Sequence, residues 1–353
     1  MRIAQVAPLY ESVPPRLYGG TERVVHYLTE ELVRAGHNVT LFGSGDSVTS
    51  ARLVSACPVA LRLSSTRFDD LALHLALLEK VYQVADRFDV IHFHLDYLHF
   101  PVSRRHNVPH LTTLHGRLDT PGLNVLYREF SEIPLVSISN AQRRPLPAAN
   151  WQATVHHGLP LDLLSMGDGS GGYLAFLGRI SPEKGIERAI EISRRAKMPL
   201  KIAAKIDMAD QEYYELHVRS LFDTENVEYI GEISESEKER FLGNASALLF
   251  PIDWPEPFGL VMIEAMSCGT PVIAFDRGSV GEVIDHGVTG FVVNNVEEAV
   301  EAVHQIRAIR RDVCRATFES RFSASRMASD YVDIYARLQR STALSETLEP
   351  VPR

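Results

Sequence analysis

The chain has 353 residues, enough for about two domains of ordinary size. Its 36 lysines and arginines against 45 aspartates and glutamates give a net charge of −9, which argues against a nucleic-acid-binding protein because such proteins carry a basic face. Three widely spaced cysteines, Cys57, Cys268 and Cys314, exclude a disulfide scaffold and a cysteine-rich zinc module. The sequence shows neither a signal peptide nor 18 consecutive apolar residues, so we expect a cytoplasmic protein without a transmembrane segment.

The first half of the chain alternates short apolar runs, rich in β-branched residues, with helical patterns. It opens with a strand at 3–7 and a loop rich in proline and glycine. Next comes a helix, which Thr21 is expected to cap and which ends at Gly36. A strand at 38–43 follows it. This βαβ unit predicts a parallel sheet. Further strands are expected at 89–94, 110–114, 134–139 and 153–156, and a further helix near 67–86.

A glycine-rich break at 165–172 predicts a hinge between two domains. The alternation then restarts, and the chain reads as almost wholly helical after about residue 296. Strands are expected at 173–177, 200–204, 227–230, 247–250, 272–275 and 291–293. The sequence therefore predicts an α/β fold of two doubly wound parallel-sheet domains, 1–165 and 166–324, with a C-terminal helix at about 325–345 bracing the first. Two such sheets place a ligand in the cleft at the carboxyl ends of their strands.

Two cations stand in the loop after the first strand of the second domain. Arg179 offers a planar fork and Lys184 a compact charge, a pair that suits a diphosphate. Between them, Ser181 and Pro182 are a favoured cap and first residue, so we expect a helix to begin at Pro182. The alternative is an exposed loop with ordinary solvated charges.

A second constellation lies between 255 and 274, where a proline-bounded loop leads into a helix starting near Phe258. Glu256 precedes this helix and Glu264 lies two turns along it. The free N–H groups of Phe258, Gly259 and Leu260 would attract an anion. Glu264 stands in an apolar run, so its buried carboxylate needs a partner, which ribose hydroxyls would supply. The alternative is a capping carboxylate followed by a satisfied core glutamate.

These two segments together resemble the retaining glycosyltransferase family 4. Its motif of two glutamates with seven residues between them matches EPFGLVMIEAM here, and a G-R-x-x-x-x-K-G loop precedes it. Weaker matches extend over nearly the whole chain, at 19–22 (GGTE), 89–94 (DVIHFH), 113–116 (TLHG), 136–139 (VSIS) and 157–162 (HGLPLD). The resemblance implies the GT-B architecture of two Rossmann-like domains facing a central cleft. Two departures, Ala204-Lys205 in place of a common glycine and His157 in place of a usual asparagine, put base and donor contacts in doubt.

The resemblance also implies roles in holding a nucleoside-diphosphate hexose, linked to UDP, GDP or ADP. Arg179 and Lys184 would neutralise its pyrophosphate. Glu264 would hold the ribose and Glu256 the hydroxyls of the sugar, while the backbone amides of 258–260 would touch the sugar or the phosphate. In the first domain, the implied roles fall on Gly19 and Gly20, whose loop would approach the phosphates, and on His115, which would lie beside the transferred sugar.

We expect no cofactor and no required metal. The chain contains no D-x-D sequence, and we expect His92 and His94 to point to opposite faces of their strand, which makes them poor ligands of one metal. The implied reaction is transfer of a hexosyl group to a hydroxyl of a saccharide or glycoconjugate, with retention of anomeric configuration. Two alternatives stay open: a GT-B nucleotide-sugar epimerase, and a non-catalytic regulator that binds nucleotide sugars. The sequence identifies no acceptor, although the loops near 48–67 and 115–130 are expected to recognise it.

Overall fold

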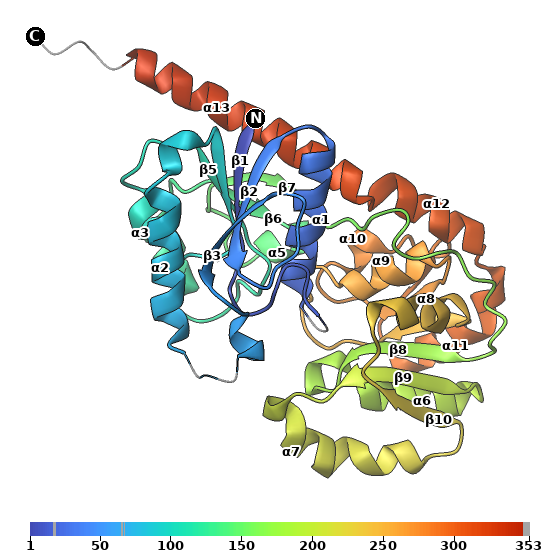
Figure 1. Ribbon diagram of the computed structural model, residues 1–353. Coiled ribbons are helices and arrows are strands. Elements are labelled where there is room, and N and C mark those ends of the chain that lie inside the picture. Colours follow the sequence, from blue (N-terminus) through green and yellow to red (C-terminus); the bar gives the residue numbers. More distant parts are fainter. Residues whose placement is uncertain (17–18, 65, 67, 349–353) are drawn as a thin grey trace, which may run out of the picture. The chain divides into compact units, whose positions relative to one another are not determined.

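The computed structural model describes residues 1–16, 19–64, 66 and 68–348, with side chains as far as 341. The chain forms two compact units (Figure 1). Unit 1 comprises Met1–Gly158 and Ala324–Arg353, and unit 2 comprises Leu159–Ser323. The last helix thus belongs to unit 1, and the chain passes between units after Gly158, whereas the sequence suggested residue 165.

Unit 1 contains a parallel sheet of seven strands in the order β3-β2-β1-β4-β5-β6-β7. The strands are β1 (Arg2–Val6), β2 (Asn38–Ser44), β3 (Arg52–Cys57), β4 (Val90–Phe93), β5 (His110–Thr113), β6 (Leu135–Ser137) and β7 (Trp151–Thr154). The main helices are α1 (Gly20–Arg34), α2 (Asp70–Tyr82), α3 (Phe100–Ser103), α4 (Leu123–Glu129), α5 (Asn140–Arg143) and α13 (Ala324–Leu348). Strand β3 was not expected, because it lies at the edge of the sheet and most of its side chains are only partly buried.

Helix α1 differs from its expected form at one end only. It begins at Gly20 after the N-cap residue Gly19, so Thr21 lies in its first turn and does not cap it. At the other end, Gly36 adopts φ +83°, the left-handed conformation that commonly ends a helix. The predicted helix end is therefore confirmed.

Unit 2 contains a parallel sheet of six strands in the order β10-β9-β8-β11-β12-β13. The strands are β8 (Leu174–Arg179), β9 (Leu200–Lys205), β10 (Val227–Gly231), β11 (Ala247–Phe250), β12 (Val272–Phe275) and β13 (Gly290–Val293). The helices are α6 (Ile186–Ala196), α7 (Gln211–Tyr213), α8 (Glu235–Gly243), α9 (Leu260–Ser267), α10 (Val280–Val283), α11 (Val296–Gln305) and α12 (Arg311–Arg321). The predicted fold class, two doubly wound α/β units, is confirmed.

Each sheet reverses its strand order beside its own first strand. The reversal falls between β1 and β4 in unit 1 and between β8 and β11 in unit 2. In open parallel sheets, ligands bind outside the carboxyl ends of the strands at such a switch point. The loops that follow these four strands are therefore the places to examine for function.

The glycine-rich segment 165–172 is not a free hinge, and that interpretation was wrong. Within unit 2, Gly167 donates a backbone hydrogen bond to Cys268 (3.0 Å), and Arg311 Nε donates to the Gly167 carbonyl (3.0 Å). A Cβ on Gly167 would lie 2.2 Å from the carbonyl oxygen of Gly243. The glycine is needed for close packing rather than for flexibility.

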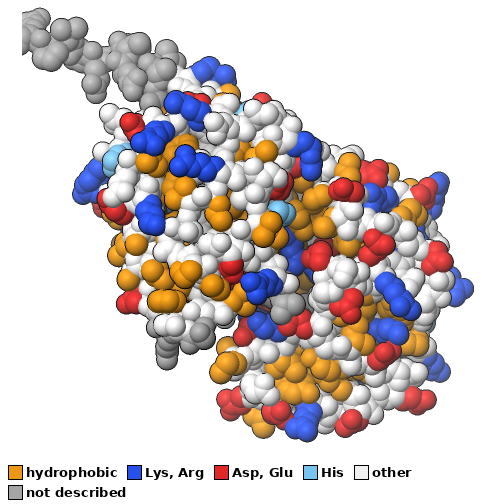
Figure 2. Space-filling model, viewed as in Figure 1, with side chains coloured by type: hydrophobic (Ala, Val, Ile, Leu, Met, Phe, Trp, Pro, Cys, Tyr) orange, Lys and Arg blue, Asp and Glu red, His pale blue; other side chains and the backbone are white. Residues whose placement is uncertain are grey.

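Charges of both signs are spread over the surface. On the face shown in Figure 2, basic and acidic side chains are interspersed over each unit, as a chain without a basic nucleic-acid footprint would have them. Among the helices that the structure describes, none is both long enough and apolar enough to cross a bilayer.

Candidate active site

The loop after β8 carries the first predicted cation pair in unit 2. Arg179 ends the strand, and a 3₁₀ turn over Pro182–Lys184 follows, so the expected helix begins only at Ile186 as α6. Gly185 adopts φ +73° between the turn and the helix, and a Cβ there would lie 2.1 Å from the carbonyl oxygen of Pro251. Glycine thus lets this loop pass against the end of β11, at the switch point.

Lys184 and Glu256 are brought together there. Lys184 Nζ donates to Glu256 Oε2 at 2.5 Å, and Trp254 Nε1 donates to the same oxygen at 3.1 Å. The ammonium also lies 4.9 Å from the centroid of the Trp254 ring, close enough for a cation–π contact. The side chains of Lys184 and Glu256 are 18% and 12% exposed, so the pair is accessible at one edge. Sequence reasoning missed Trp254, although it stands two residues before Glu256 in the same loop.

Arg179 is held by a different set of carboxylates. Its Nη2 donates to Glu183 Oε1 at 2.7 Å, and its Nε lies 3.3 Å from Asp210 Oδ2. Burial raises the pKa of Asp210, and Arg179 opposes that rise. Lys205, noted above only as a departure from the family pattern, ends β9 directly beside Arg179 in the strand register. The two predicted cations therefore lie at the end of β8 and in the turn after it, and each already pairs with acidic side chains.

The N-terminus of α9 lies in the loop that follows β11. The helix begins at Leu260, after Gly259 with φ +79°, where a Cβ would lie 2.9 Å from Met262 Cε. Phe258 is buried, and its carbonyl accepts a hydrogen bond from Ser279 Oγ at 2.8 Å. The first N–H groups of a helix lack partners within it, and the helix dipole places partial positive charge there. In α9, the third of these groups, Met262 N–H, donates to the Gly259 carbonyl at 3.0 Å.

Glu264 lies in α9 with its side chain 5% exposed. Lys238 Nζ, from α8, donates to Glu264 Oε1 at 2.7 Å and lies 3.3 Å from Glu235 Oε2. The buried carboxylate thus has a partner within the protein. The argument that burial requires a ribose to satisfy it was therefore wrong, and a ribose contact stays a prediction that rests on the family resemblance.

In unit 1, His115 lies in the loop after β5, and the loop is held by Gln142 of α5. Gln142 Nε2 donates to the carbonyls of Leu114 (2.8 Å) and Gly116 (2.9 Å), the two neighbours of the histidine. The ring of His115 stacks on that of His157, with centroids 5.3 Å apart. Its environment lowers the pKa of His115 to about 3, because desolvation disfavours the imidazolium.

We expected His92, in β4, and His94, directly after it, to point to opposite faces, and this expectation was wrong. The rings of His92 and His94 lie 4.1 Å apart, because residues two apart in a strand share a face. Burial lowers the pKa of both well below the ordinary value. His94 Nδ1 lies 2.9 Å from His115 Nε2, so the strand contacts the candidate site directly.

Gly19 and Gly20 lie where α1 begins, after the carboxyl end of β1. A Cβ on Gly19 would lie 2.7 Å from Pro15 Cβ, so the loop needs glycine for its close packing. Residues 17 and 18 of the same loop are outside the described part of the chain. Glu22, in the first turn of the helix, is buried, and desolvation raises its pKa.

Two family models match the chain, one within each unit. The model of Glycosyltransferase Family 4 matches residues 18–155, and that of Glycosyl transferases group 1 matches residues 168–316. The chain belongs to glycosyltransferase family 4. The matched segments contain all ten residues predicted for the site.

The glycosyltransferase is similar to several curated proteins. A Klebsiella pneumoniae protein described as an uncharacterized 41.2 kDa protein of the cps region is 31% identical over 168 residues, covering 46% of this chain and 45% of that protein. Phosphatidyl-myo-inositol mannosyltransferase of Mycobacterium leprae is 25% identical, covering 97% of this chain and 98% of that protein.

Two solved structures show that the glycosyltransferase has a GT-B fold. Sucrose-phosphate synthase of Thermosynechococcus elongatus aligns with a TM-score of 0.79 at 18% identity over 96% of this chain and 99% of that one. HepE of Anabaena, solved in complex with UDP and glucose, aligns with a TM-score of 0.72 at 19% identity over 96% of this chain and 100% of that one.

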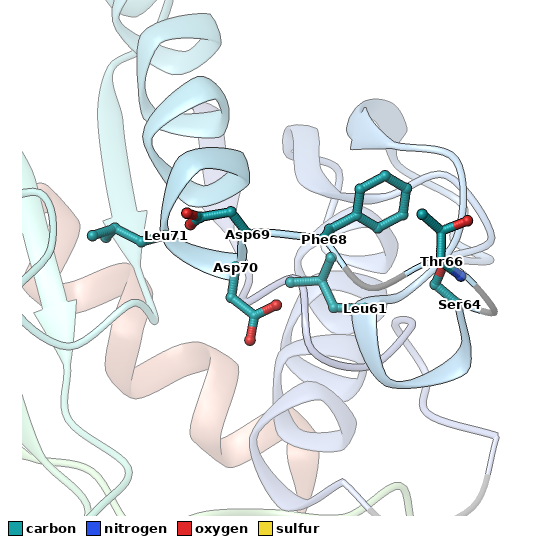
Figure 3. Close-up of a pocket in the computed structure, with 7 residues that line it drawn as sticks. All are labelled: Leu61, Ser64, Thr66, Phe68, Asp69, Asp70 and Leu71. Carbon is teal, nitrogen blue, oxygen red and sulfur yellow. The ribbon is translucent and has the colours of Figure 1, made fainter.

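The described residues of the glycosyltransferase contain no group of three histidine, cysteine, aspartate or glutamate side chains placed to hold a metal ion. They do contain a pocket of about 550 Å³ in unit 1 (Figure 3). Its walls come from the 3₁₀ turn Leu61–Leu63, from described residues of the segment after it, and from the start of α2. The lining residues are Leu61, Ser64, Thr66, Phe68, Asp69, Asp70 and Leu71. The pocket overlaps the first of the two loops expected to recognise the acceptor.

Proposed function

We propose that this glycosyltransferase moves a hexosyl group from a nucleoside-diphosphate sugar to a hydroxyl of a saccharide or glycoconjugate, with retention and without a metal. One observation carries the proposal. At the switch point of unit 2, Arg179 ends β8 and Lys184 lies in the turn that follows, while the loop after β11 ends at the N-terminus of α9. These groups supply the positive charge that a diphosphate requires.

The carboxylates around these cations suggest how the donor binds. A diphosphate would take Lys184 from Glu256 and would compete with Glu183 and Asp210 for Arg179. The Glu256 carboxylate, once released, is a hydrogen-bond acceptor that suits sugar hydroxyls. The ion pairs thus keep the cations in place and exchange partners when the donor arrives.

The proposed reaction breaks the bond between C1 of the sugar and the leaving phosphate oxygen, and forms a bond between C1 and the acceptor oxygen on the same face. Negative charge grows on the diphosphate, where Arg179, Lys184 and the N-terminus of α9 stabilise it. The acceptor proton passes to a phosphate oxygen of the leaving group. No carboxylate has to act as a nucleophile.

The comparisons support the choice of hexosyl chemistry without fixing the donor. A relative that aligns over nearly the whole chain is named as a mannosyltransferase, and a structural neighbour was solved with UDP and glucose. We therefore keep UDP, GDP and ADP as candidate nucleotides. A cytoplasmic location belongs to the same proposal, and the three unpaired, buried cysteines support it.

Trp254 offers a direct test. We expect the three nucleoside diphosphates to be distinguished by calorimetric titration, and the tight one to change the fluorescence of Trp254 as it displaces Glu256 from Lys184. The Trp254→Phe variant, which keeps Trp151, serves as the matched control and should lose the signal. Incubation with the corresponding sugar nucleotides and a panel of acceptors should then give a glycoside whose anomeric proton shows retention. Absence of binding by all three diphosphates, or release of an epimerised sugar without transfer, would overturn the proposal.

A further inference from the structure

Buried polar groups of unit 1 form a chain of hydrogen bonds that begins at His115. His115 Nε2 lies 2.9 Å from His94 Nδ1, and His94 Nε2 lies 2.8 Å from Gln5 Oε1. The amide nitrogen of Gln5 donates to the hydroxyl of Tyr335 at 3.1 Å. Gln5, His94 and Tyr335 are all buried. The chain joins strand β1, the end of β4, the loop after β5 and helix α13.

The direction of each hydrogen bond follows from the chemistry of Gln5. Its amide nitrogen faces Tyr335, so its carbonyl oxygen faces His94 and can only accept. His94 Nε2 therefore carries a proton. Burial lowers the pKa of His94 well below its ordinary value, so the ring is neutral and its Nδ1 has no proton. The hydrogen bond between the two histidines must then be donated by His115 Nε2.

A neutral His115 that donates through Nε2 has a bare lone pair on Nδ1. This Nδ1 is buried and has no hydrogen-bond partner among the residues that the structure describes. A buried acceptor without a partner is unfavourable, and it becomes satisfied when a ligand donates to it. An O–H or N–H group of a ligand could therefore donate a hydrogen bond to His115 Nδ1.

We propose that Gln5 and His94 are positioning residues that fix the tautomer of His115, so that its Nδ1 accepts a hydrogen bond from a substrate hydroxyl. The tautomer follows from the hydrogen-bond geometry together with the burial of His94, whereas the identity of the ligand as a sugar hydroxyl rests on the proposed function. A hydroxyl donor fits this site, and a carboxylate or phosphate oxygen does not, because neither has a hydrogen to donate.

Two tyrosines of the C-terminal helix continue this network beyond Gln5. The Tyr335 hydroxyl lies 2.7 Å from His92 Nδ1, and His92 Nε2 lies 2.7 Å from Thr113 Oγ1. Thr113 in turn lies 2.8 Å from the hydroxyl of Tyr331. The two tyrosines of α13 thus extend the network. If the Gln5 amide were flipped, its oxygen would face Tyr335 and its nitrogen would face His94.

Histidine nitrogen resonances test the tautomer without any assay of activity. In the protein labelled with ¹⁵N-histidine, we expect His115, assigned by comparison with His115→Gln, to show a protonated Nε2 and a bare Nδ1. His94→Asn should preserve this tautomer, because its side-chain oxygen replaces Nδ1 as the acceptor, whereas His94→Leu should release it to a mixture. A protonated Nδ1 in the wild type overturns the inference, and the wild-type spectrum decides this even where a variant fails to fold. An unchanged tautomer in a folded His94→Leu variant also overturns it.

Kinetics then link the tautomer to the reaction. His94→Leu should lower kcat by about tenfold or more with little change in the KM for the sugar nucleotide, and His94→Asn should restore most of that loss. The surface variant His304→Gln is the matched control and should leave both parameters unchanged. If the tautomer is as proposed and no sugar nucleotide is used, the proposed function fails and the tautomer stands. If transfer occurs and His94→Leu retains the full kcat, the positioning role fails.

Discussion

The candidate site residues of unit 1 lie in a neutral histidine network, whereas those of unit 2 include an ion pair. Around His115 in unit 1, His92, His94 and His157 are buried, and burial holds their pKa values well below the ordinary range, so the network is neutral. In unit 2, Lys184 and Glu256 are full charges with partly exposed side chains. An ion pair at an accessible edge can exchange partners with a charged ligand. A buried neutral network instead holds fixed hydrogen-bond directions. The contrast suggests that unit 2 neutralises charge and unit 1 orients hydroxyls.

The largest effect is expected from the removal of the Lys184 ammonium in unit 2. We expect Lys184→Ala to lower the transfer rate by about 10²–10³-fold, corresponding to about 2.7–4 kcal/mol, because the leaving diphosphate loses a charged partner. The fold should survive, since Glu256 keeps its hydrogen bond from Trp254. Initial rates and circular dichroism check both statements. Lys201→Ala, which removes another lysine that pairs with a glutamate, is the matched control. A folded Lys184→Ala variant with a near-wild-type rate would contradict the diphosphate role.

The two glutamates give the next largest effect. Glu256→Gln should lower kcat strongly, because its carboxylate is assigned to the sugar. The bare nucleoside diphosphate should bind no more weakly than to the wild type, because Lys184 then has no carboxylate of residue 256 to leave. Glu264→Gln should weaken that diphosphate by about 1.5–3 kcal/mol, the value of a charge-assisted hydrogen bond. Calorimetric titration of both variants with the bare diphosphate, beside turnover with the sugar nucleotide, separates the two roles.

The ion pair of Glu264 requires its own control. Glu264→Gln also removes the ion pair between Lys238 of α8 and Glu264 of α9, so weaker binding could reflect a disturbed core. Lys238→Met removes the same ion pair but keeps the carboxylate. If this variant loses as much nucleotide affinity as Glu264→Gln, the assigned ribose contact is wrong. Equal weakening by Glu256→Gln and Glu264→Gln would refute the division of roles.

The fold was largely predictable from local sequence because its strands are short apolar runs with clear ends. Strands β11 and β12 begin and end where the sequence indicated, between residues such as Pro251 and Pro271 that interrupt the ladder. Edge strand β3 escaped prediction because only one of its sides pairs with a neighbour and its residues are only partly buried. Local periodicity carries little signal for such a strand.

The candidate site was predictable as a set of residues but not as a set of contacts. The motif loops indicated Lys184 and Glu256, yet nothing local showed that the two would pair. The partners of Glu264 and Gln5, which are Lys238 and Tyr335, lie on other helices. Such pairs depend on tertiary packing between distant segments, which the spacing of residues within one segment does not encode.

Lowering the pH should destabilise unit 1 more than unit 2. His92, His94 and His157 have lowered pKa values when folded and ordinary values near 6.5 when unfolded. Below about pH 6.5 the unfolded chain therefore binds protons that the folded chain does not. The unfolding free energy should fall by up to about 1.4 kcal/mol per histidine for each further pH unit, until the folded pKa values are reached.

The chain offers a reporter in each unit for this experiment. Trp151 lies in β7 of unit 1 and Trp254 in unit 2, and they are the 2 tryptophans of the chain. Urea titrations of Trp254→Phe and of Trp151→Phe at pH 7.5, 6.5 and 5.5 follow unit 1 and unit 2 respectively. The midpoint reported by Trp151 should fall more steeply with pH, because the histidines of unit 2 are exposed. Equal shifts of both midpoints would contradict the assignment of the pH-sensitive network to unit 1.

Removal of divalent metal should have the smallest effect, namely none. The leaving diphosphate already meets Arg179, Lys184 and the N-terminus of α9 in the proposed mechanism, and the sequence lacks a D-x-D carboxylate pair. Transfer should therefore proceed at the same rate in EDTA as in buffer with Mg²⁺ or Mn²⁺. A loss of turnover that added metal reverses would contradict this expectation. The Lys184→Ala variant sharpens the test: if a metal supplied the positive charge, raising Mg²⁺ would restore much of the rate lost with the lysine. We expect no such rescue, because in the proposed mechanism the protein's own cations neutralise the leaving group.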